Sequence, residues 1–202
     1  MKVITIGREL GSGGRTIGKR VAETLGIPYY DRELIDETAK HSGLAVEAVE
    51  ENDQTLTRSF LYDLAMGTSY GYLNTAGVPL DVNTQVFLAQ REAILRFAEN
   101  PCVLVGRCAD YILRGSGHLL RVFIYADMNA RIKRAVEEYG MAPEKAQKEI
   151  AQSDRRRARH YEEVTDGIWG ARQNYDLMIN SSRTGIEDAV RIICALAREE
   201  ND

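Results

Sequence analysis

The segment Gly7–Thr16 carries the clearest chemical signal of the sequence, because four glycines fall within its first eight residues. It lies between a short apolar run at 3–6 and a stretch at 16–25 whose apolar residues recur with helical spacing. Backbone N–H groups around such a loop, with the positive end of the following helix behind them, form a cradle for phosphate groups. We therefore expect a phosphate site made of Gly11, Ser12, Gly13, Gly14, Arg15 and Thr16.

This loop departs from the P-loop pattern G-x-x-x-x-G-K-[ST], whose lysine reaches the β- and γ-phosphates of a nucleotide. When the variant ending G-K-G-T is allowed, the lysine position falls on Gly14, the next position on Arg15, and the first glycine on Arg8. We expect Arg15 to reach the same phosphate oxygens from a different angle, and Thr16 to offer its hydroxyl to Mg²⁺. The missing lysine leaves open a protein that binds nucleotides without catalysis.

A dinucleotide-binding loop is a further alternative, because Gly11 and Gly13 begin a G-x-G-x-x-G match and Asp31 lies about where a ribose-binding acid is expected. The match fails at Thr16, which stands in place of the third glycine. The long helical stretch that follows residue 31 also opposes this reading. A dinucleotide-dependent oxidoreductase therefore ranks below a phosphate-binding protein.

A second basic segment, 154–159, contains four arginines and one aspartate. Planar guanidinium groups suit phosphate oxygens, and phosphoryl transfer needs positive charge around the transferring group. Arg155 and Arg159 are four residues apart and share one face of a helix. Taken alone, a basic run is more typical of a solvated helix face. If the segment belongs to a site, these two residues, followed by Arg156, are the ones we expect to close over the phosphates and act in catalysis.

The elements that position these residues are those of an α/β fold. Near-continuous apolar runs predict strands buried on both faces of a central parallel sheet, at 3–6, 102–105, 120–125 and 177–179, with a further short strand at 28–31. Helical patterns lie at 16–25, 33–41, 46–51, 57–66, 83–99, 129–139, 144–163 and 186–199. We therefore predict one domain, with about five parallel strands flanked by helices.

Composition narrows the class of protein further. A chain of 202 residues with 44% hydrophobic residues is the size of one domain with a sizeable core. Its net charge of -4 opposes binding to a nucleic-acid polymer, and no apolar run approaches the roughly 18 residues that span a bilayer. Three cysteines cannot all pair and lack metal-ligand spacing, which fits a cytoplasmic protein. The oligomeric state is left open.

Four segments together resemble the cytidylate kinase-like family of P-loop nucleoside monophosphate kinases. They are Ile4–Arg15, Ile27–Ile35, Val105–Asp110 and Tyr175–Ser182, and they span nearly the whole chain in the expected order. The resemblance implies a three-layer P-loop kinase fold over 1–202, with a helical acceptor-binding insertion at 32–100 and a lid at 140–170. It implies phosphoryl transfer from ATP, with Mg²⁺, to a small acceptor such as a nucleoside monophosphate.

The same resemblance suggests roles for individual residues. Gly11–Thr16 would hold the phosphates of ATP, and Thr16 would bind Mg²⁺. Asp31 and Arg32 match the start of the acceptor-binding segment, and Arg107 matches an acceptor-contacting arginine that follows the third strand. The acceptor itself stays open, because the segment that would select it, 52–82, carries no motif that identifies it.

Overall fold

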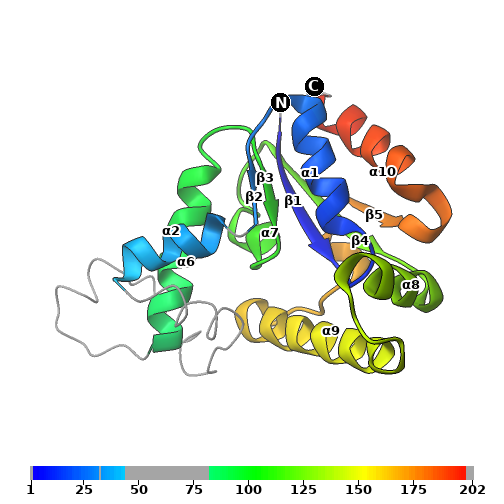
Figure 1. Cartoon of the computed structure of the whole chain (residues 1–202). Coiled ribbons are helices and arrows are strands. Elements are labelled where there is room, and N and C mark those ends of the chain that lie inside the picture. Colours follow the sequence, from blue (N-terminus) through cyan, green and yellow to red (C-terminus); the bar gives the residue numbers. More distant parts are fainter. Residues whose placement is uncertain (1, 32, 44–81, 199–202) are drawn as a thin grey trace.

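One five-stranded sheet forms the centre of the protein (Figure 1). The computed structural model describes residues 2–31, 33–43 and 82–198. The strand order is β2-β3-β1-β4-β5, and every neighbouring pair is parallel. The strands are β1 Val3–Arg8, β2 Tyr29–Tyr30, β3 Val103–Val105, β4 Leu119–Tyr125 and β5 Leu177–Asn180. The predicted parallel sheet of about five strands is confirmed.

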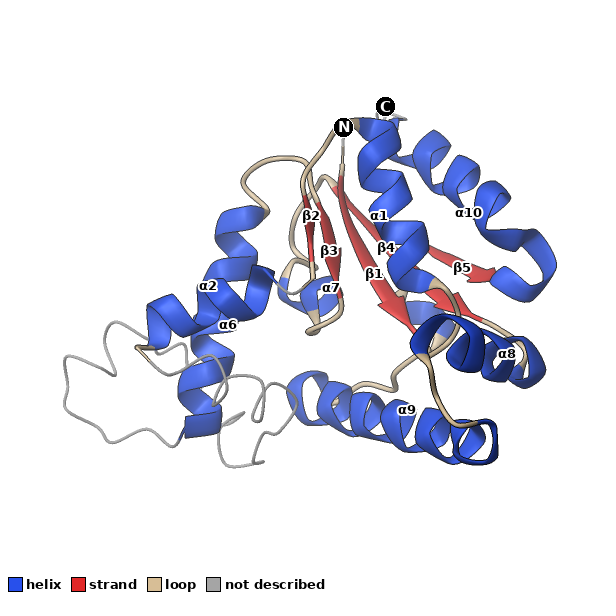
Figure 2. Ribbon diagram, viewed as in Figure 1, coloured by secondary structure: helices blue, strands red, loops and turns tan. Residues whose placement is uncertain are grey.

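Helices cover both faces of this sheet, which gives three layers (Figure 2). On one face, α1 (Gly14–Leu25) and α10 (Ser181–Arg198) bury Ile17 and Ile193 against strand residues such as Ile4. On the other face, α6 (Val82–Phe97) and α7 (Ala109–Ile112) pack over Leu104, together with α2 (Glu33–Ser42). Successive strand residues point to opposite faces, so each strand is apolar throughout.

Most predicted helices are present with small shifts at their ends. The helix expected from residue 186 is the second part of α10, which bends at Gly185, where the backbone leaves helical geometry. The four-residue helix α7 has no sequence prediction, because one turn is too short to display helical periodicity. The helices expected at 46–51 and 57–66 lie outside the described residues.

Two further helices lie across the carboxyl ends of the strands (Figure 1). They are α8 (Met128–Tyr139) and α9 (Pro143–Thr165), and the 3₁₀ turn η1 (Arg172–Asn174) follows them before β5. Ligands of open parallel sheets bind outside the carboxyl ends of the strands, so α9 covers the edge at which a site is expected. Among the described residues, no helix is both long and apolar enough to span a membrane.

Candidate functional site

The glycine loop runs from the end of β1 at Arg8 to the start of α1 at Gly14. Gly11 and Gly13 both have φ +79°, in the left-handed region that favours glycine. A Cβ on Gly11 would lie 2.7 Å from the Arg131 carbonyl oxygen, so no other residue fits there. A cavity of about 340 Å³ opens beside the loop, lined by Arg8, Glu9, Leu10, Gly11, Gly13, Gly14, Arg15, Tyr139, Met141 and Arg157.

Arg131 of α8 fixes the loop to α9. Its Nε donates a 2.7 Å hydrogen bond to the Leu10 carbonyl oxygen, and its guanidinium pairs with Glu9 at 3.2 Å and with Asp154. The same Asp154 accepts a 2.9 Å hydrogen bond from the Leu10 backbone N–H. Arg131 is 4% exposed, so its positive charge supports the loop and does not face the open cavity.

Two more contacts complete that support. Arg134 donates a 3.0 Å hydrogen bond to the Gly11 carbonyl oxygen. Ser181, at the start of α10, donates a 2.6 Å hydrogen bond to the Ser12 carbonyl oxygen. Because carbonyl groups of the loop are held from α8 and α10, its conformation is set before any phosphate binds, which lowers the ordering cost of binding.

Asp31 gathers three arginines at the carboxyl ends of β1, β2 and β3. Its side chain is 9% exposed and lies 2.6 Å from Nε of Arg15, 3.5 Å from Nη2 of Arg8 and 3.7 Å from Nη1 of Arg107. Arg107 also donates a 2.8 Å hydrogen bond to the Asp31 carbonyl oxygen. Three of the residues expected in the site, Asp31, Arg15 and Arg107, are therefore together, whereas Arg32 lies outside the described residues.

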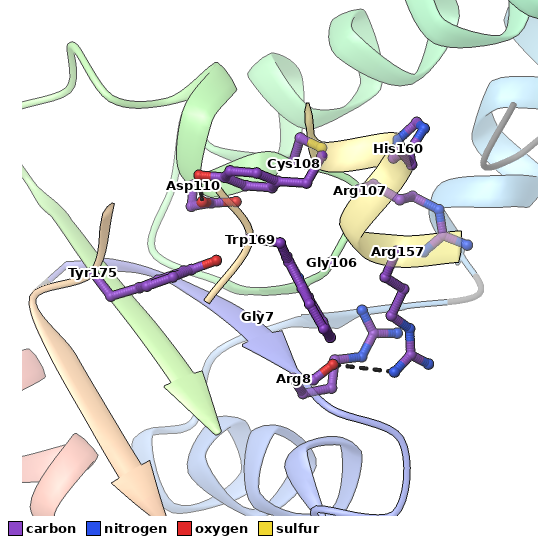
Figure 3. A pocket seen from close by; sticks show the side chains of 11 residues that line it. Gly7, Arg8, Gly106, Arg107, Cys108, Asp110, Arg157, His160, Trp169 and Tyr175 are labelled. Carbon is purple, nitrogen blue, oxygen red and sulfur yellow. Dashed lines mark hydrogen bonds between the residues drawn. The ribbon is translucent and has the colours of Figure 1, made fainter. Parts of the chain in front are cut away.

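A second, smaller cavity lies beside this cluster (Figure 3). Its volume is about 40 Å³, against the roughly 10–15 Å³ that one water needs by a comparable measure, so it has room for a group the size of a phosphate. Three guanidinium groups line it, those of Arg8, Arg107 and Arg157, and its remaining wall includes Asp110, His160, Tyr161, Trp169 and Tyr175.

The far wall of this cavity is largely buried. It includes Asp110, from a segment that carries the resemblance, and Tyr161 and Trp169, from the expected lid region. Tyr161 donates a 2.9 Å hydrogen bond to Asp110. Burial raises the pKa of Asp110, and it also raises the pKa of Tyr161 above its usual range. Trp169 packs edge-on against Phe123 of β4, with ring centroids 5.2 Å apart. This wall is therefore largely aromatic, and its carboxylate, Asp110, is buried and hydrogen-bonded.

Arg157 is the member of the basic segment that faces the site. It reaches from α9 to β1 and donates a 3.1 Å hydrogen bond to the Arg8 carbonyl oxygen (Figure 3). Burial lowers its pKa. The helical spacing of apolar residues indicates the buried face of α9. Ala146, Ile150, Tyr161 and Val164 mark the buried stripe of α9, and residue 157 falls on that stripe at helical spacing.

The other arginines of the segment lie on the outer surface of α9. Arg155 and Arg156 are exposed, and the Arg159 side chain is 81% exposed and pairs with Glu163 at 2.9 Å. The structure does not bring these three to the glycine loop in the conformation described. Their closing over the phosphates stays a prediction.

Thr16 also lies apart from the glycine-loop cavity. It is exposed on α1 and lines a separate hollow with Arg15, Lys19, Arg20, Glu23 and Tyr29. Within the described part of the chain, no cluster of three or more His, Cys, Asp or Glu side chains is placed to hold a metal. The glycine-loop cavity fits phosphates better than it fits a protein-held cation, so Thr16 as a Mg²⁺ ligand stays a prediction.

Comparison with known proteins identifies the family. The sequence profile of the cytidylate kinase-like family matches residues 3–183. The chain belongs to this family. Two relatives carry the name cytidylate kinase: one from Methanopyrus kandleri, 24% identical over 96% of this chain and 91% of its own length, and one from Pyrococcus horikoshii, 24% identical over 96% of this chain and 86% of its own length.

Solved structures agree with this fold. A protein of Eubacterium ventriosum, described as uncharacterized, superposes with a TM-score of 0.73 at 25% identity, covering 99% of this chain and all of its own. Shikimate kinase from Bacteroides thetaiotaomicron superposes with a TM-score of 0.55 at 16% identity, covering 98% of this chain and all of its own, which concerns the fold alone. This protein therefore has a P-loop kinase fold. Its membership of the family supports the activity of a kinase that acts on nucleotides or other small molecules.

Proposed function

We propose that this protein transfers the γ-phosphoryl group of ATP to a nucleoside monophosphate. The observation that carries the proposal is a pair of adjacent cavities that share Arg8 and Arg157. The larger lies along the glycine loop, and the smaller is lined by three guanidinium groups. A phosphoryl donor and an acceptor phosphate need two such neighbouring anion sites.

In this proposal the glycine loop and the N-terminus of α1 bind the phosphates of ATP. The residues proposed are those expected from the sequence, Gly11–Thr16. Of these, Gly11, Gly13, Gly14 and Arg15 line the cavity, whereas Ser12 is buried behind the loop and Thr16 lies outside it. Mg²⁺ would arrive bound to ATP and partly neutralise its phosphates. Thr16 is the proposed contact from this chain, and no step of the reaction depends on it.

The acceptor phosphate would lie in the small cavity, held by Arg107 and close to Asp31. A phosphate acceptor suits this site because its attacking oxygen is already ionised and needs no base. One of its oxygens forms a bond to the γ-phosphorus as the bond from that phosphorus to the β–γ bridging oxygen breaks. The electron pair of the broken bond leaves with ADP.

The carboxylates of the site favour the same kind of acceptor. A hydroxyl acceptor needs a group to receive its proton. Asp31 is occupied by arginines, and Asp110 is hydrogen-bonded to Tyr161. The described residues that line the two cavities include the four arginines Arg8, Arg15, Arg107 and Arg157, but two carboxylates, Asp110 and Glu9, and Glu9 pairs with Arg131. The relatives named cytidylate kinase make CMP the first acceptor to test.

Two alternatives remain to be compared with this proposal. A protein that binds nucleotides without catalysis is suggested by Gly14 in the lysine position. A dinucleotide-dependent oxidoreductase is opposed by the sheet order, because β1 lies between β3 and β4, whereas the dinucleotide-binding order places β1 beside β2.

A coupled assay for ADP formation tests the proposal, with ATP and Mg²⁺ and a panel of CMP, UMP, AMP and other small acceptors. Turnover with one nucleoside monophosphate well above the rate without acceptor is the expected result. Stabilisation by ATP in a thermal melt, with no turnover on any acceptor, would instead identify a binding protein. Stabilisation by NAD but not by ATP would favour the oxidoreductase.

A further inference from the structure

The side chain of Arg8 occupies the space beside the first residue of α1. A Cβ placed on Gly14 would lie 2.5 Å from Cβ of Arg8 and 3.0 Å from its Cγ, closer than real Cβ contacts allow. Gly14 is the first residue of α1 and is not among the glycines with positive φ. Glycine is needed there for space rather than for backbone conformation, although it weakens a helix relative to alanine.

The far end of the same side chain lies against a second glycine, Gly106. A Cβ on Gly106, directly after β3, would lie 1.9 Å from Nη1 of Arg8. The Arg8 side chain thus extends from the end of β1, past the start of α1, to the end of β3. It crosses the carboxyl edge of the sheet between the glycine loop and the small cavity, and lines both cavities.

Positions 8 and 14 reverse the residues of the P-loop pattern. The pattern places glycine at the first position and lysine six residues later, whereas this chain has Arg8 and then Gly14. Because the two Cβ positions are 2.5 Å apart, only one of them can carry a side chain. We infer that Arg8 supplies to the transferring phosphoryl group the positive charge that a P-loop lysine supplies from position 14. The inference rests on the function proposed above.

The surroundings of the Arg8 guanidinium favour the binding of a phosphate group beside it. Its side chain is 13% exposed, and its contact with Asp31 is a long one of 3.5 Å. Within the described parts of the chain, its Nε has no hydrogen-bond partner. Burial, followed by the neighbouring Arg157, lowers the pKa of Arg8 to about 9, so it stays protonated at neutral pH. A phosphate group between the two arginines would relieve both the burial of charge and their mutual repulsion.

Arg15, the replacement expected from the sequence, has different surroundings. Its side chain is 64% exposed, and it already forms a 2.6 Å ion pair with Asp31. It lines the glycine-loop cavity but not the small one, whereas Arg8 lines both. The group that moves between donor and acceptor passes between the two cavities, so Arg8 is the better placed of the two.

An exchange of the two positions tests this inference. The variants are Arg8→Ala, Arg8→Gln, Arg15→Ala and the double exchange R8G/G14K, with Arg191→Ala as a matched control. Arg191 is exposed on α10 and pairs with Asp188, and it lines neither of the two cavities. Each variant is measured for its melting temperature, its kcat and KM for ADP formation, and its binding of tripolyphosphate by calorimetry.

Loss of Arg8 should lower kcat by about 10²–10³-fold, as for removal of one group that stabilises charge in the transition state. Tripolyphosphate affinity should fall by about tenfold or more, the loss of one charge-assisted contact. The double exchange should restore both to within about tenfold of the wild type, because a lysine at 14 then has the space that Arg8 used. The control should match the wild type in all three measurements.

Other outcomes overturn the inference. A folded R8G/G14K protein no more active than Arg8→Ala would do so, and so would a larger loss of kcat in Arg15→Ala than in Arg8→Ala at equal melting temperature. If Arg8→Ala melts below the assay temperature, Arg8→Gln takes its place. If the wild type forms no ADP with any acceptor, the proposed function fails on its own. Tripolyphosphate binding then decides about Arg8: loss restored by the exchange supports its role, and unchanged binding in Arg8→Ala refutes it.

Discussion

The negative charge of Asp31 lies among three arginines of the site. Its carboxylate lies within 3.7 Å of three of them and is almost fully buried. Like charges at this spacing repel, and burial increases the cost. Asp31 therefore offsets part of the repulsion among these arginines.

Replacing Asp31 with asparagine should destabilise the protein strongly. Removing one partner from a buried ion pair leaves the other charge uncompensated, so the free energy of unfolding should fall by about 3 kcal/mol. Urea denaturation measures this change. Pyrophosphate should stabilise the variant more than the wild type, because it returns the missing negative charge. Asp188→Asn, in an exposed pair with Arg191, is the control, and an equal effect of the two substitutions would contradict this account.

Within α9, we expect Arg157 to contribute more to turnover than Arg159. Arg157 lines both cavities, whereas the Arg159 side chain is 81% exposed and pairs with Glu163. Arg157→Ala should lower kcat/KM for ADP formation by about 10²-fold, the scale for losing one donor to the transition state. Arg159→Ala should cost less than about tenfold if α9 keeps its orientation. The opposite ranking would mean that α9 turns on binding and that the prediction from the sequence was right.

This ranking also shows what the sequence could and could not predict about the site. The glycine loop was recognisable because glycine spacing is a local feature, and Asp31 and Arg107 were recognisable from the resemblance to the family. Arg157 and Arg8 were not selected, since their role depends on which face of α9 is buried and on the 2.5 Å approach of two Cβ positions. The stripe of buried residues in α9 could have identified Arg157. The contact between Arg8 and Gly14 exists only in the folded chain.

At the scale of elements, strands were predicted more accurately than short helices. The residues of β3 are buried on both faces of the sheet, and a short continuous apolar run of this kind is typical of a buried parallel strand. The four residues of α7 begin after Cys108, which has φ +53° and no side-chain cap. A single turn of this kind depends on packing against the sheet rather than on its own sequence.

The pairing of β4 with β5 is reinforced by an ion pair whose effect depends on pH. Asp176 accepts hydrogen bonds from Arg121 at Nη2 (2.6 Å), at Nε (3.1 Å) and at the backbone N–H (2.8 Å). Burial alone would raise the pKa of Asp176, but these hydrogen bonds outweigh it and lower the pKa below its usual value of 3.8. The contribution to stability is therefore present above about pH 4 and is lost as the pH falls through the lowered pKa.

Asp176→Asn should lower the free energy of unfolding at pH 7 by about 1 kcal/mol, a small value because the side chain is 37% exposed and screened by solvent. Denaturation curves of the variant and the wild type at pH 7, 5, 4 and 3 provide the measurement. The difference between the two proteins should shrink at the acid end. A difference that stays constant over this range would contradict the assignment of the stabilisation to this carboxylate.

Over the whole molecule, an acidic total hides two basic segments. Residues 1–20 contain five Lys and Arg against one acid, and residues 131–160 contain nine against five, within a chain of net charge -4. The fold brings parts of both together, since Arg157 of α9 reaches Arg8 of β1. The result is a positive cleft on a negative protein, which attracts small anions and disfavours a long polyanion.

This arrangement predicts that nucleotide binding weakens with salt. Raising NaCl from 0.05 to 0.5 M shortens the screening length severalfold, so the dissociation constant of ADP should rise by roughly tenfold. The stabilisation that ADP gives in a thermal melt should fall in parallel, because at fixed ligand concentration it depends on that constant. Melts of the protein without ADP in the same salts separate this effect from changes in the fold.

Arg157→Ala should bind ADP with a smaller salt dependence than the wild type, since one fewer cation then contributes to the field of the cleft. Equal salt dependence in the two proteins would mean that the phosphates of ADP bind away from Arg157. They would then also lie outside the cavities that Arg157 and Arg8 line.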